Sequence, residues 1–463
     1  MSGVTAWLDP AACPATPPAR ASMAEATRLL HEALDAHARR SGVPYLHPDE
    51  PTVQQDLFGS TRVIAWQEAK AAFLFAAEGC WSELSPLYAR YGTGATGDLI
   101  ARLKTLEGAG AAIVCDSGMQ ATALVFDALM VPGAHAVLCR QVYNKTRTYL
   151  RWLADRLGGD VTIVDDGDHA ALAAAIRPTT RLVFAETFTN PLVRAQDVPA
   201  LAAIVAAARA SAPDLRLIID STIATPWAFA TPLLAHGVDV VVASGTKALG
   251  GTDRDLWGYI ATNDTPLANA VMDLVAMRGG ILDWRRAAVI VEGLADANGR
   301  HARRSATATR VAAFLAGHPR VSEVFHPSRP EHADAAVVAR DYQRHGSLLS
   351  FRVNGADEAA TRHVADVIAT TGVIRYALSF DGLATKVNHH QTVSEYFTPA
   401  PDLRRSGFDR LVRLGIGLED ADDLIAALNW ALHHADRITP AEARAWQDAR
   451  ATALGATDTP PGV

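Results

Sequence analysis

Between residues 99 and 283, short apolar runs alternate with alanine-rich stretches of helical periodicity. The runs are rich in β-branched residues and show no polar alternation, which is typical of strands buried on both faces of a parallel sheet. Strands that alternate with helices predict an α/β fold with a mostly parallel, doubly wound sheet, which binds ligands beyond the carboxyl ends of its strands. The predicted strands are AAIVCD (111–116), HAVLCR (135–140), DVTIVDD (160–166), RLVFAET (181–187), LRLIIDS (215–221) and DVVVASG (239–245).

The pattern changes near residue 284. A stretch rich in arginine and alanine (283–319) predicts one long helix. It is followed by three predicted strands and a closing helix: GSLLSFRV (346–353), GVIRYALSF (372–380), LVRLGIGLED (411–420) and DADDLIAALNWALHHADRI (420–438). We therefore expect an N-terminal extension (1–84), an α/β domain (85–283) and a smaller C-terminal α+β domain that ends in a disordered tail (284–463).

Composition narrows the class of protein. The chain has 463 residues, 49% of them hydrophobic and 20% charged, and a formal net charge of -7, as is usual for a soluble globular protein. There is no basic stripe for nucleic acid, no apolar run of about 18 residues for a membrane, and no signal-peptide pattern. We expect a cytoplasmic protein in which Cys13, Cys80, Cys115 and Cys139 are free thiols. We expect no metal site, because the adjacent His389 and His390 would point in opposite directions on a strand.

Polar residues follow several of the predicted strands. In CDSGMQA, the backbone N–H groups of Gly118 and Met119 open a helix, which suits a phosphate. Asp220 ends a strongly apolar strand, and a carboxylate buried there needs a cation such as a pyridinium nitrogen, an arginine or a helix N-terminus. Tyr143 and Asn190 follow two further strands at the same edge. These side chains predict a ligand site at the carboxyl edge of the sheet.

Lys247 is one of only five lysines in the chain. It follows an apolar strand and the hydroxyls of Ser244 and Thr246, and two glycines come soon after it. Unlike arginine, lysine can lose its proton and act as a nucleophile. This placement suits an imine between Lys247 and pyridoxal 5′-phosphate (PLP), with Ser244 and Thr246 holding the phosphate.

Together and in this order, these motifs resemble the Cys/Met-metabolism family of PLP-dependent enzymes of fold type I, which includes cystathionine synthases and lyases, methionine γ-lyases and O-acylhomoserine sulfhydrylases. The resemblance runs from about Tyr88 to about Leu432. It implies that residues 85–283 bind PLP. It also implies a homo-oligomer, dimer or tetramer, because YARYG resembles a motif whose Tyr88 and Arg90 reach the cofactor phosphate of the neighbouring subunit.

The resemblance implies a role for each matching side chain. Lys247 is the imine lysine and later carries the proton, and Tyr143 or Tyr88 assists as an acid near the leaving group. The other implied roles are phosphate binding by Gly118, Met119, Ser244 and Thr246, stacking on the cofactor ring by Tyr143, a contact with the ring nitrogen by Asp220 beside Thr222, a contact with the phenolic oxygen by Asn190, and substrate binding by Arg413, Ser379 and Asn190.

The chain departs from the family pattern mainly at the edge that faces the substrate. Asn144 and Lys145 follow the stacking tyrosine, and Phe380 and Asp381 follow Ser379. Lys145 and the nearby Arg147 could meet an acidic leaving group or nucleophile, or could form a solvated basic edge. We infer familiar cofactor chemistry on an unfamiliar substrate.

The favoured function is γ-replacement on an O-activated homoserine-type amino acid, which forms a carbon–sulfur or carbon–carbon bond. Two alternatives stay open. One is a γ- or β-lyase of the methionine γ-lyase or cystathionine lyase type. The other is a non-catalytic PLP-binding protein of the same fold. Leu378, just before Ser379, argues mildly against cystathionine, whose distal ammonium would be met by an acidic residue.

Overall fold

The computed structural model describes residues 90–453. The predicted N-terminal extension (1–84), Tyr88, two of the four cysteines and the predicted disordered tail after residue 453 lie outside this range. The predictions made for them stay predictions. Among the described residues, no helix is both long and apolar enough to cross a bilayer.

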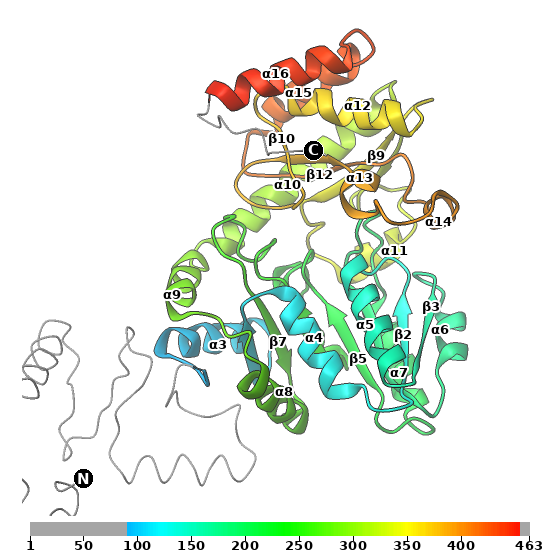
Figure 1. Ribbon diagram of the computed structural model, residues 1–463, viewed down its shortest axis with the longest axis vertical. Helices are drawn as coiled ribbons and strands as arrows, with labels where there is room; N and C mark the ends of the chain where they lie inside the picture. The colour runs from blue at the N-terminus through cyan, green and yellow to red at the C-terminus, as the bar shows by residue number, and fades with distance from the viewer. Residues whose placement is uncertain (1–89, 454–463) are drawn as a thin grey trace, which may run out of the picture.

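A seven-stranded sheet fills the lower part of Figure 1. Neighbouring strands from β6 to β3 are parallel, whereas β7 is antiparallel to both β1 and β6. All six predicted strands are present. The sequence does not predict the seventh strand, β7, because its run of Gly, Tyr, Ile, Ala and Thr is only weakly apolar. The strand order is β1 (Ala111–Cys115), β7 (Gly258–Thr262), β6 (Val240–Ala243), β5 (Arg216–Asp220), β4 (Thr180–Glu186), β2 (His135–Cys139) and β3 (Asp160–Val164).

Helices cover both faces of this sheet. Crossovers between parallel strands are right-handed, so the direction in which the chain moves across the sheet decides which face each helix covers. The chain moves outward from β1 through β2 to β3, which places α4 and α5 on one face. It then moves back through β4 to β5, which places α6 and α7 on the other face. Gly108 adopts the left-handed conformation (φ 62°) that ends α3. The helices are α3 (Gly94–Glu107), α4 (Gly118–Leu129), α5 (Asn144–Arg156), α6 (His169–Ala175), α7 (Val198–Ala208) and α8 (Thr265–Arg278), with two 3-10 turns (Pro226–Ala228 and Leu233–His236).

A second, five-stranded sheet lies in the upper part of Figure 1. Its strands are antiparallel except for β10 and β11. Of the predicted run 372–380, only two residues form a strand, and the sequence pattern predicts neither β8 nor β11. The order is β10 (Arg375–Tyr376), β11 (Lys386–His389), β12 (Val412–Gly415), β9 (Leu348–Val353) and β8 (Val321–Phe325). The helices are α11 (Ala335–Asp341), α12 (Glu358–Ala369), α13 (His390–Ser394), α14 (Ala400–Ser406), α15 (Ala421–His434) and α16 (Pro440–Ala453).

The single long helix expected over 283–319 is wrong. The chain forms α9 (Trp284–Gly293) and α10 (Ala297–Gly317) with a break between them. The apolar face of α9 packs against α3 beside the large sheet, whereas α10 packs against β8, β9 and α15. A straight helix could not bury both faces against two different layers, so the chain turns after Gly293.

Two apolar cores underlie the two sheets, and a third, smaller cluster joins them. This joining cluster includes Phe188, Val193, Ile223, Tyr342 and Leu348. It fixes the upper sheet against the loop after β4, at the carboxyl edge of the large sheet. The domain boundaries at residues 84 and 283 stay a prediction.

Candidate active site

A cavity of about 370 Å³ lies at the carboxyl edge of the large sheet, where the upper sheet covers it. Ten of the predicted cofactor- and substrate-binding residues line this one cavity. They are Gly118, Met119, Tyr143, Asn190, Asp220, Thr222, Ser244, Lys247, Ser379 and Arg413.

A tightly packed backbone forms one end of the cavity. Ser117 accepts the N–H of Gln120 at 3.2 Å and starts α4, so the free N–H groups of the first helical turn face the cavity. A Cβ atom on Gly118 would lie 2.5 Å from Cβ of Ser244, so only glycine fits there. Thr222 holds the facing loop, because its hydroxyl accepts the N–H of Ser244 at 2.8 Å. The result is a small polar cradle of backbone amides and hydroxyls at a helix N-terminus, which is chemistry that binds phosphate.

Two carboxyl groups lie side by side beneath the cavity. Glu186 ends β4 and Asp220 ends β5, and the two residues are register partners. Burial raises the pKa of Asp220 to about 6, although the N–H of Thr222, 2.8 Å away, counteracts it. Burial also raises the pKa of Glu186 well above its usual range, and the charge of Asp220 raises it further. Among the described residues, no Lys, Arg or His lies within ion-pair distance of Asp220.

Lys247 enters the cavity from the loop after β6. Its Nζ donates to the hydroxyl of Ser379 at 2.7 Å and lies 5.4 Å from the ring centroid of Phe380. Burial lowers the pKa of the Lys247 amine below its ordinary value. The negative charge of Asp381 opposes this shift, and the positive charges of Lys386 and Arg413 add to it. A lysine in such surroundings releases its proton more readily than a solvated one.

Arg413 enters the cavity from β12 of the upper sheet and is only 2% exposed. Its two terminal nitrogens donate to Oδ1 of Asn190 at 3.1 Å and to the carbonyl oxygen of Leu378 at 3.0 Å. Burial lowers its pKa to about 10. Among the described residues, no carboxylate lies within ion-pair distance of the Arg413 guanidinium. A buried guanidinium of this kind is suited to an anionic ligand.

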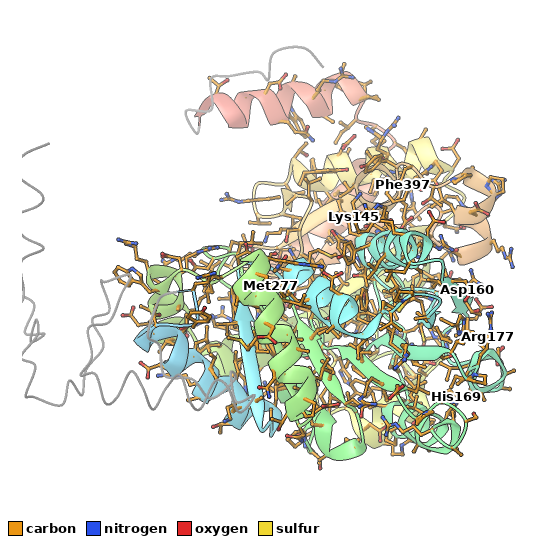
Figure 2. All side chains as sticks on the ribbon, turned by 60° about the horizontal axis from the view of Figure 1, so that its bottom comes forward. Lys145, Asp160, His169, Arg177, Met277 and Phe397 are labelled. Atoms are coloured by element: carbon orange, nitrogen blue, oxygen red, sulfur yellow. The ribbon has the colours of Figure 1, made fainter. Side chains whose placement is uncertain are left out.

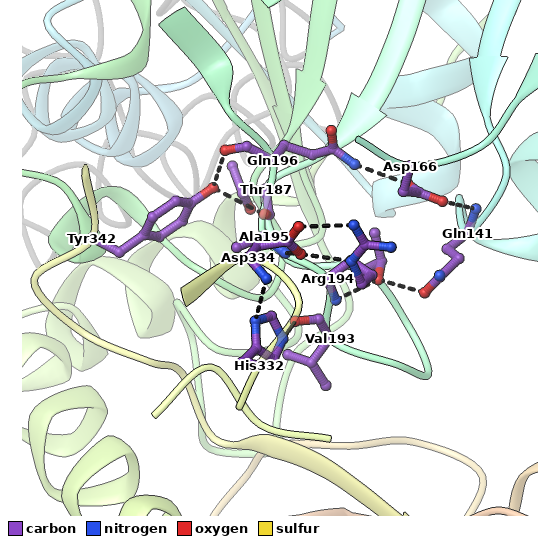
Figure 3. A network of polar contacts seen from close by, with 11 residues as sticks. Gln141, Asp166, Thr187, Val193, Arg194, Ala195, Gln196, His332, Asp334 and Tyr342 are labelled. Atoms are coloured by element: carbon purple, nitrogen blue, oxygen red, sulfur yellow. Dashed lines mark hydrogen bonds and ion pairs between the residues drawn. The ribbon is translucent and has the colours of Figure 1, made fainter. Parts of the chain in front are cut away.

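A polar network holds the loop that carries Asn190 (Figure 3). Arg194 forms a bidentate ion pair with Asp334 at 2.6 and 2.8 Å, and Asp334 also accepts the N–H of Ala195 at 2.9 Å. The Thr189 hydroxyl donates to Gln141 at 2.8 Å, which ties this loop to the one that carries Tyr143. The network therefore fixes two sides of the cavity from behind.

The upper sheet also supplies the outer wall of the cavity. The Asn144 side chain donates to the carbonyl oxygen of Ser394. Arg147 forms a 3.0 Å ion pair with Glu395, and both side chains are largely buried. Arg147 is thus not part of a solvated basic edge. Lys145 is exposed, lines the cavity and lies 5.1 Å from the ring centroid of Phe397, beside which Figure 2 shows it.

Some predicted site residues lie elsewhere. The hydroxyl of Thr246 exchanges hydrogen bonds with the backbone of Trp257 at 2.9 and 3.1 Å and does not line the cavity. Arg90 donates to the carbonyl oxygen of Ala276 at 2.8 Å, on α8. Tyr88, its expected companion, is outside the described range.

The histidine and cysteine predictions can be compared directly with the structure. His389 ends β11 and lies 2.8 Å from Glu358, whereas His390 is buried at the start of α13. Within residues 90–453, no group of three or more His, Cys, Asp or Glu side chains could hold a metal ion. Cys115 and Cys139 are buried free thiols, as the sequence predicts.

Sequence reasoning gave no specific role to several cavity residues. Glu186 carries the same signal as Asp220, since each is an acid at the end of an apolar strand. Phe380, Val393 and Tyr396 line the cavity without any such signal, because they come from the loops and the short helix α13 that adjoin the upper sheet. Only the packing of the two sheets brings them to the site.

The cavity fits PLP on three counts. The cradle at Gly118 and Ser244 suits the phosphate. Asp220 offers a partly buried carboxylate that no cation of the described chain pairs, and Lys247 supplies an amine of lowered pKa. A mostly parallel sheet that presents these groups at one edge is the arrangement of a PLP-dependent enzyme. The comparisons with known proteins make the assignment more specific.

The sequence profile of the family described as "Cys/Met metabolism PLP-dependent enzyme" matches residues 68–433. Cystathionine gamma-synthase of Mycobacterium bovis is 34% identical over 345 residues, which cover 74% of this chain and 86% of that protein. Chloroplastic cystathionine gamma-synthase 1 of Arabidopsis thaliana is 32% identical over 347 residues, 74% of this chain but only 60% of the plant protein. An O-succinylhomoserine sulfhydrylase of Mycobacterium tuberculosis is 30% identical over 351 residues, 75% of this chain and 84% of that protein.

Among solved structures, cystathionine gamma-lyase of Lactobacillus plantarum, complexed with L-serine, superposes with a TM-score of 0.72 at 26% identity. It covers 82% of this chain and 94% of its own. The chain belongs to the Cys/Met metabolism family of PLP-dependent enzymes and has the type I fold, as the resemblance implied. The relatives named here are a synthase, a sulfhydrylase and a lyase, that is, transferases and lyases.

Proposed function

We propose that this enzyme catalyses γ-replacement on an O-activated homoserine-type amino acid, with Lys247 as its central catalytic residue. The supporting observation is that Lys247 and Arg413 reach one cavity from different sheets. They contact consecutive residues, since Lys247 bonds to Ser379 and Arg413 to the carbonyl oxygen of Leu378. An amino acid whose carboxylate pairs with Arg413 would therefore have its α-carbon near the Lys247 amine.

In the proposed reaction, bound PLP supplies an electron sink for a carbanion next to the amino group. Arg413 binds the substrate carboxylate, and Asn190 holds the guanidinium in place. The Lys247 amine, whose pKa burial lowers, takes the α-proton and returns it later in the reaction. Asp220 would hold the ring nitrogen as a carboxylate, and the cradle around Gly118 and Ser244 would hold the phosphate.

The leaving group lies toward the outer wall of the cavity. Tyr143 or Tyr88 is the proposed acid that protonates it. Tyr143 is 42% exposed and lines the cavity, so its hydroxyl can reach a bound substrate. Burial raises the pKa of Tyr143, which keeps the phenol protonated until it donates.

We also propose a homo-oligomer with active sites shared between subunits. Arg90 supports this proposal, because it lies on the surface beside α8, outside the cavity of its own chain. In an oligomer, Tyr88 and Arg90 would complete the phosphate site of a neighbouring subunit.

The test is an absorbance spectrum of the purified enzyme before and after addition of O-acetyl- or O-succinyl-L-homoserine. We expect a visible band from the cofactor bound to Lys247 and its loss in Lys247→Ala. Substrate should shift the band, and 2-oxobutyrate should form only when no thiol or carbon nucleophile is supplied. Release of 2-oxobutyrate at the same rate with and without nucleophile would identify a lyase instead. A bound cofactor without turnover of any substrate would indicate the non-catalytic alternative.

A further inference from the structure

The carboxyl group of Glu186 lies between two residues of the proposed cofactor site. Glu186 and Asp220 are register partners at the ends of neighbouring parallel strands, so their side chains point to the same face of the sheet. Glu186 is 5% exposed, and its Oε1 accepts the backbone N–H of Tyr143 at 2.6 Å. No role in the reaction proposed above is assigned to it.

The contact matters because α5 has no cap of its own. Tyr143 occupies the N-cap position, but its side chain makes no capping hydrogen bond. The ring is 42% exposed, so packing alone does not fix it over the cavity. A capping residue positions the start of a helix through its backbone, and here Glu186 anchors that backbone from the neighbouring strand.

We propose that Glu186 is a positioning residue, which holds the Tyr143 backbone against the end of β4 so that the tyrosine ring lies over the cavity above Asp220. The inference rests on the proposed function, because it assumes that Tyr143 and Asp220 contact the cofactor. It goes beyond that function by giving a buried acid a defined task.

The proposal includes a neutral Glu186, because two ionised carboxyl groups side by side in a buried site would repel each other. Asp220 on β5 and Asp166 after β3 both raise its pKa, on top of the larger effect of burial. The Tyr143 N–H and Arg147 on α5 lower it, but Arg147 is already paired with Glu395. In the proposed arrangement Asp220 carries the single negative charge beneath the ring, and Glu186 acts only as a hydrogen-bond acceptor toward Tyr143.

This assignment separates two substitutions of similar size. Glu186→Gln keeps a neutral acceptor for the Tyr143 N–H, so PLP should bind the apoprotein within about twofold of wild type. Glu186→Leu removes the acceptor and leaves the N–H unpaired, so PLP should bind about tenfold more weakly, as expected for one lost hydrogen bond. The readout is titration of cofactor-free protein with PLP, which needs no turnover.

Glu107 offers a matched control. It is also a buried acid, 1% exposed, and accepts the hydroxyl of Tyr259 at 2.5 Å, but neither residue lines the cavity. Glu107→Leu should lower the unfolding midpoint of the apoprotein and leave PLP affinity unchanged. If Glu186→Leu does not fold, Glu186→Ala takes its place in the titration.

The pH dependence of the visible band gives a second readout. With a neutral Glu186, the profile of Glu186→Gln should coincide with that of wild type. A shift of that profile to lower pH would show that Glu186 is ionised, because removing its charge would lower the pKa of Asp220, and the proposal would be wrong. It would also fail if Glu186→Leu bound PLP as well as wild type. Failure of the wild-type protein to bind PLP would instead refute the proposed function.

Discussion

Replacement of Gly118 by alanine should weaken cofactor binding by opening the cradle. The added Cβ would lie 2.5 Å from Cβ and 2.8 Å from Cα of Ser244, whereas carbon atoms pack best at about 3.5–4.0 Å. The start of α4 and the loop that carries Ser244 must therefore separate by about 1 Å. Gly118 cannot retreat, because Gly258 of β7 lies directly behind it. A Cβ on Gly258 would come within 2.5 Å of Cα of Gly118.

Gly118→Ala should lower both the stability of the fold and the affinity for PLP. Overpacking of this kind destabilises a fold by about 1–3 kcal/mol. Displacement of Ser244 also strains its 2.8 Å hydrogen bond to Thr222 and moves donors away from the phosphate. Loss of one such contact weakens PLP binding about tenfold. Titration of the apoprotein with PLP and thermal unfolding of the apoprotein measure the two effects.

Gly97 provides the control for Gly118→Ala. It is an exposed residue inside α3, and a Cβ added there would have nothing within 4 Å. Gly97→Ala should therefore stabilise the protein by about 0.5–1 kcal/mol, because alanine favours the helix, and should leave PLP affinity unchanged. If Gly118→Ala behaved like Gly97→Ala in both assays, the close approach of the two loops would not form a cofactor cradle.

Three further substitutions test the groups around the cavity. Because burial raises the pKa of Asp220 to about 6, its contribution to folding is fully present below about pH 4, its usual range, and is lost as the pH rises through 6. In chemical denaturation from pH 4 to 8, apoprotein carrying Asp220→Asn should therefore gain stability over wild type as the pH rises, and a constant difference would contradict this. Arg304→Lys should lower stability by about 2 kcal/mol, because the fully buried guanidinium donates to the carbonyl oxygen of Ala248 at 2.6 Å, next to Lys247. The unfolding midpoint should fall and the visible band broaden or shift; an unchanged midpoint would be the contrary result. Asp334→Asn should weaken the pair with Arg194 behind the Asn190 loop and raise KM for the amino acid several-fold with little change in kcat, whereas an unchanged KM would show that the loop is fixed without it.

Much of the lower sheet was predictable because its strands are continuous apolar runs. The six predicted strands needed only the contrast between such runs and the helices between them. β7 is not predicted, because its run of Gly, Tyr, Ile, Ala and Thr lacks the continuous apolar, β-branched character of the six predicted strands. The break between α9 and α10 is not predicted for a different reason. Helical periodicity continues through it, and the turn is required only because α9 packs beside the large sheet whereas α10 packs against the upper sheet.

The candidate site also contains residues whose position follows from the sequence pattern and residues whose position does not. Lys247, Asp220 and Gly118 follow strands of one parallel sheet, so their meeting at one edge follows from topology alone. Arg413 and Ser379 reach the cavity only because the upper sheet docks onto that edge, and no local pattern encodes this docking. Their expected place rested on family resemblance. Thr246 carries the same local signal as Ser244, yet its hydroxyl bonds to the Trp257 backbone, because neighbouring residues of a turn point in different directions.

The two unpaired charges of the cavity explain why such an arrangement persists in a folded protein. Burial of a charge without a partner costs free energy, and both Asp220 and Arg413 lack an ion-pair partner within the described chain. A ligand pair that brings a ring cation to Asp220 and a carboxylate to Arg413 would satisfy both, and binding would then stabilise the folded state by mass action. The same free-energy argument applies to Glu186. A second ionised carboxyl group beside Asp220 would add another uncompensated charge, whereas a neutral one adds only a hydrogen bond. Groups that weaken the isolated fold are therefore concentrated at the one cavity where a ligand can offset their cost.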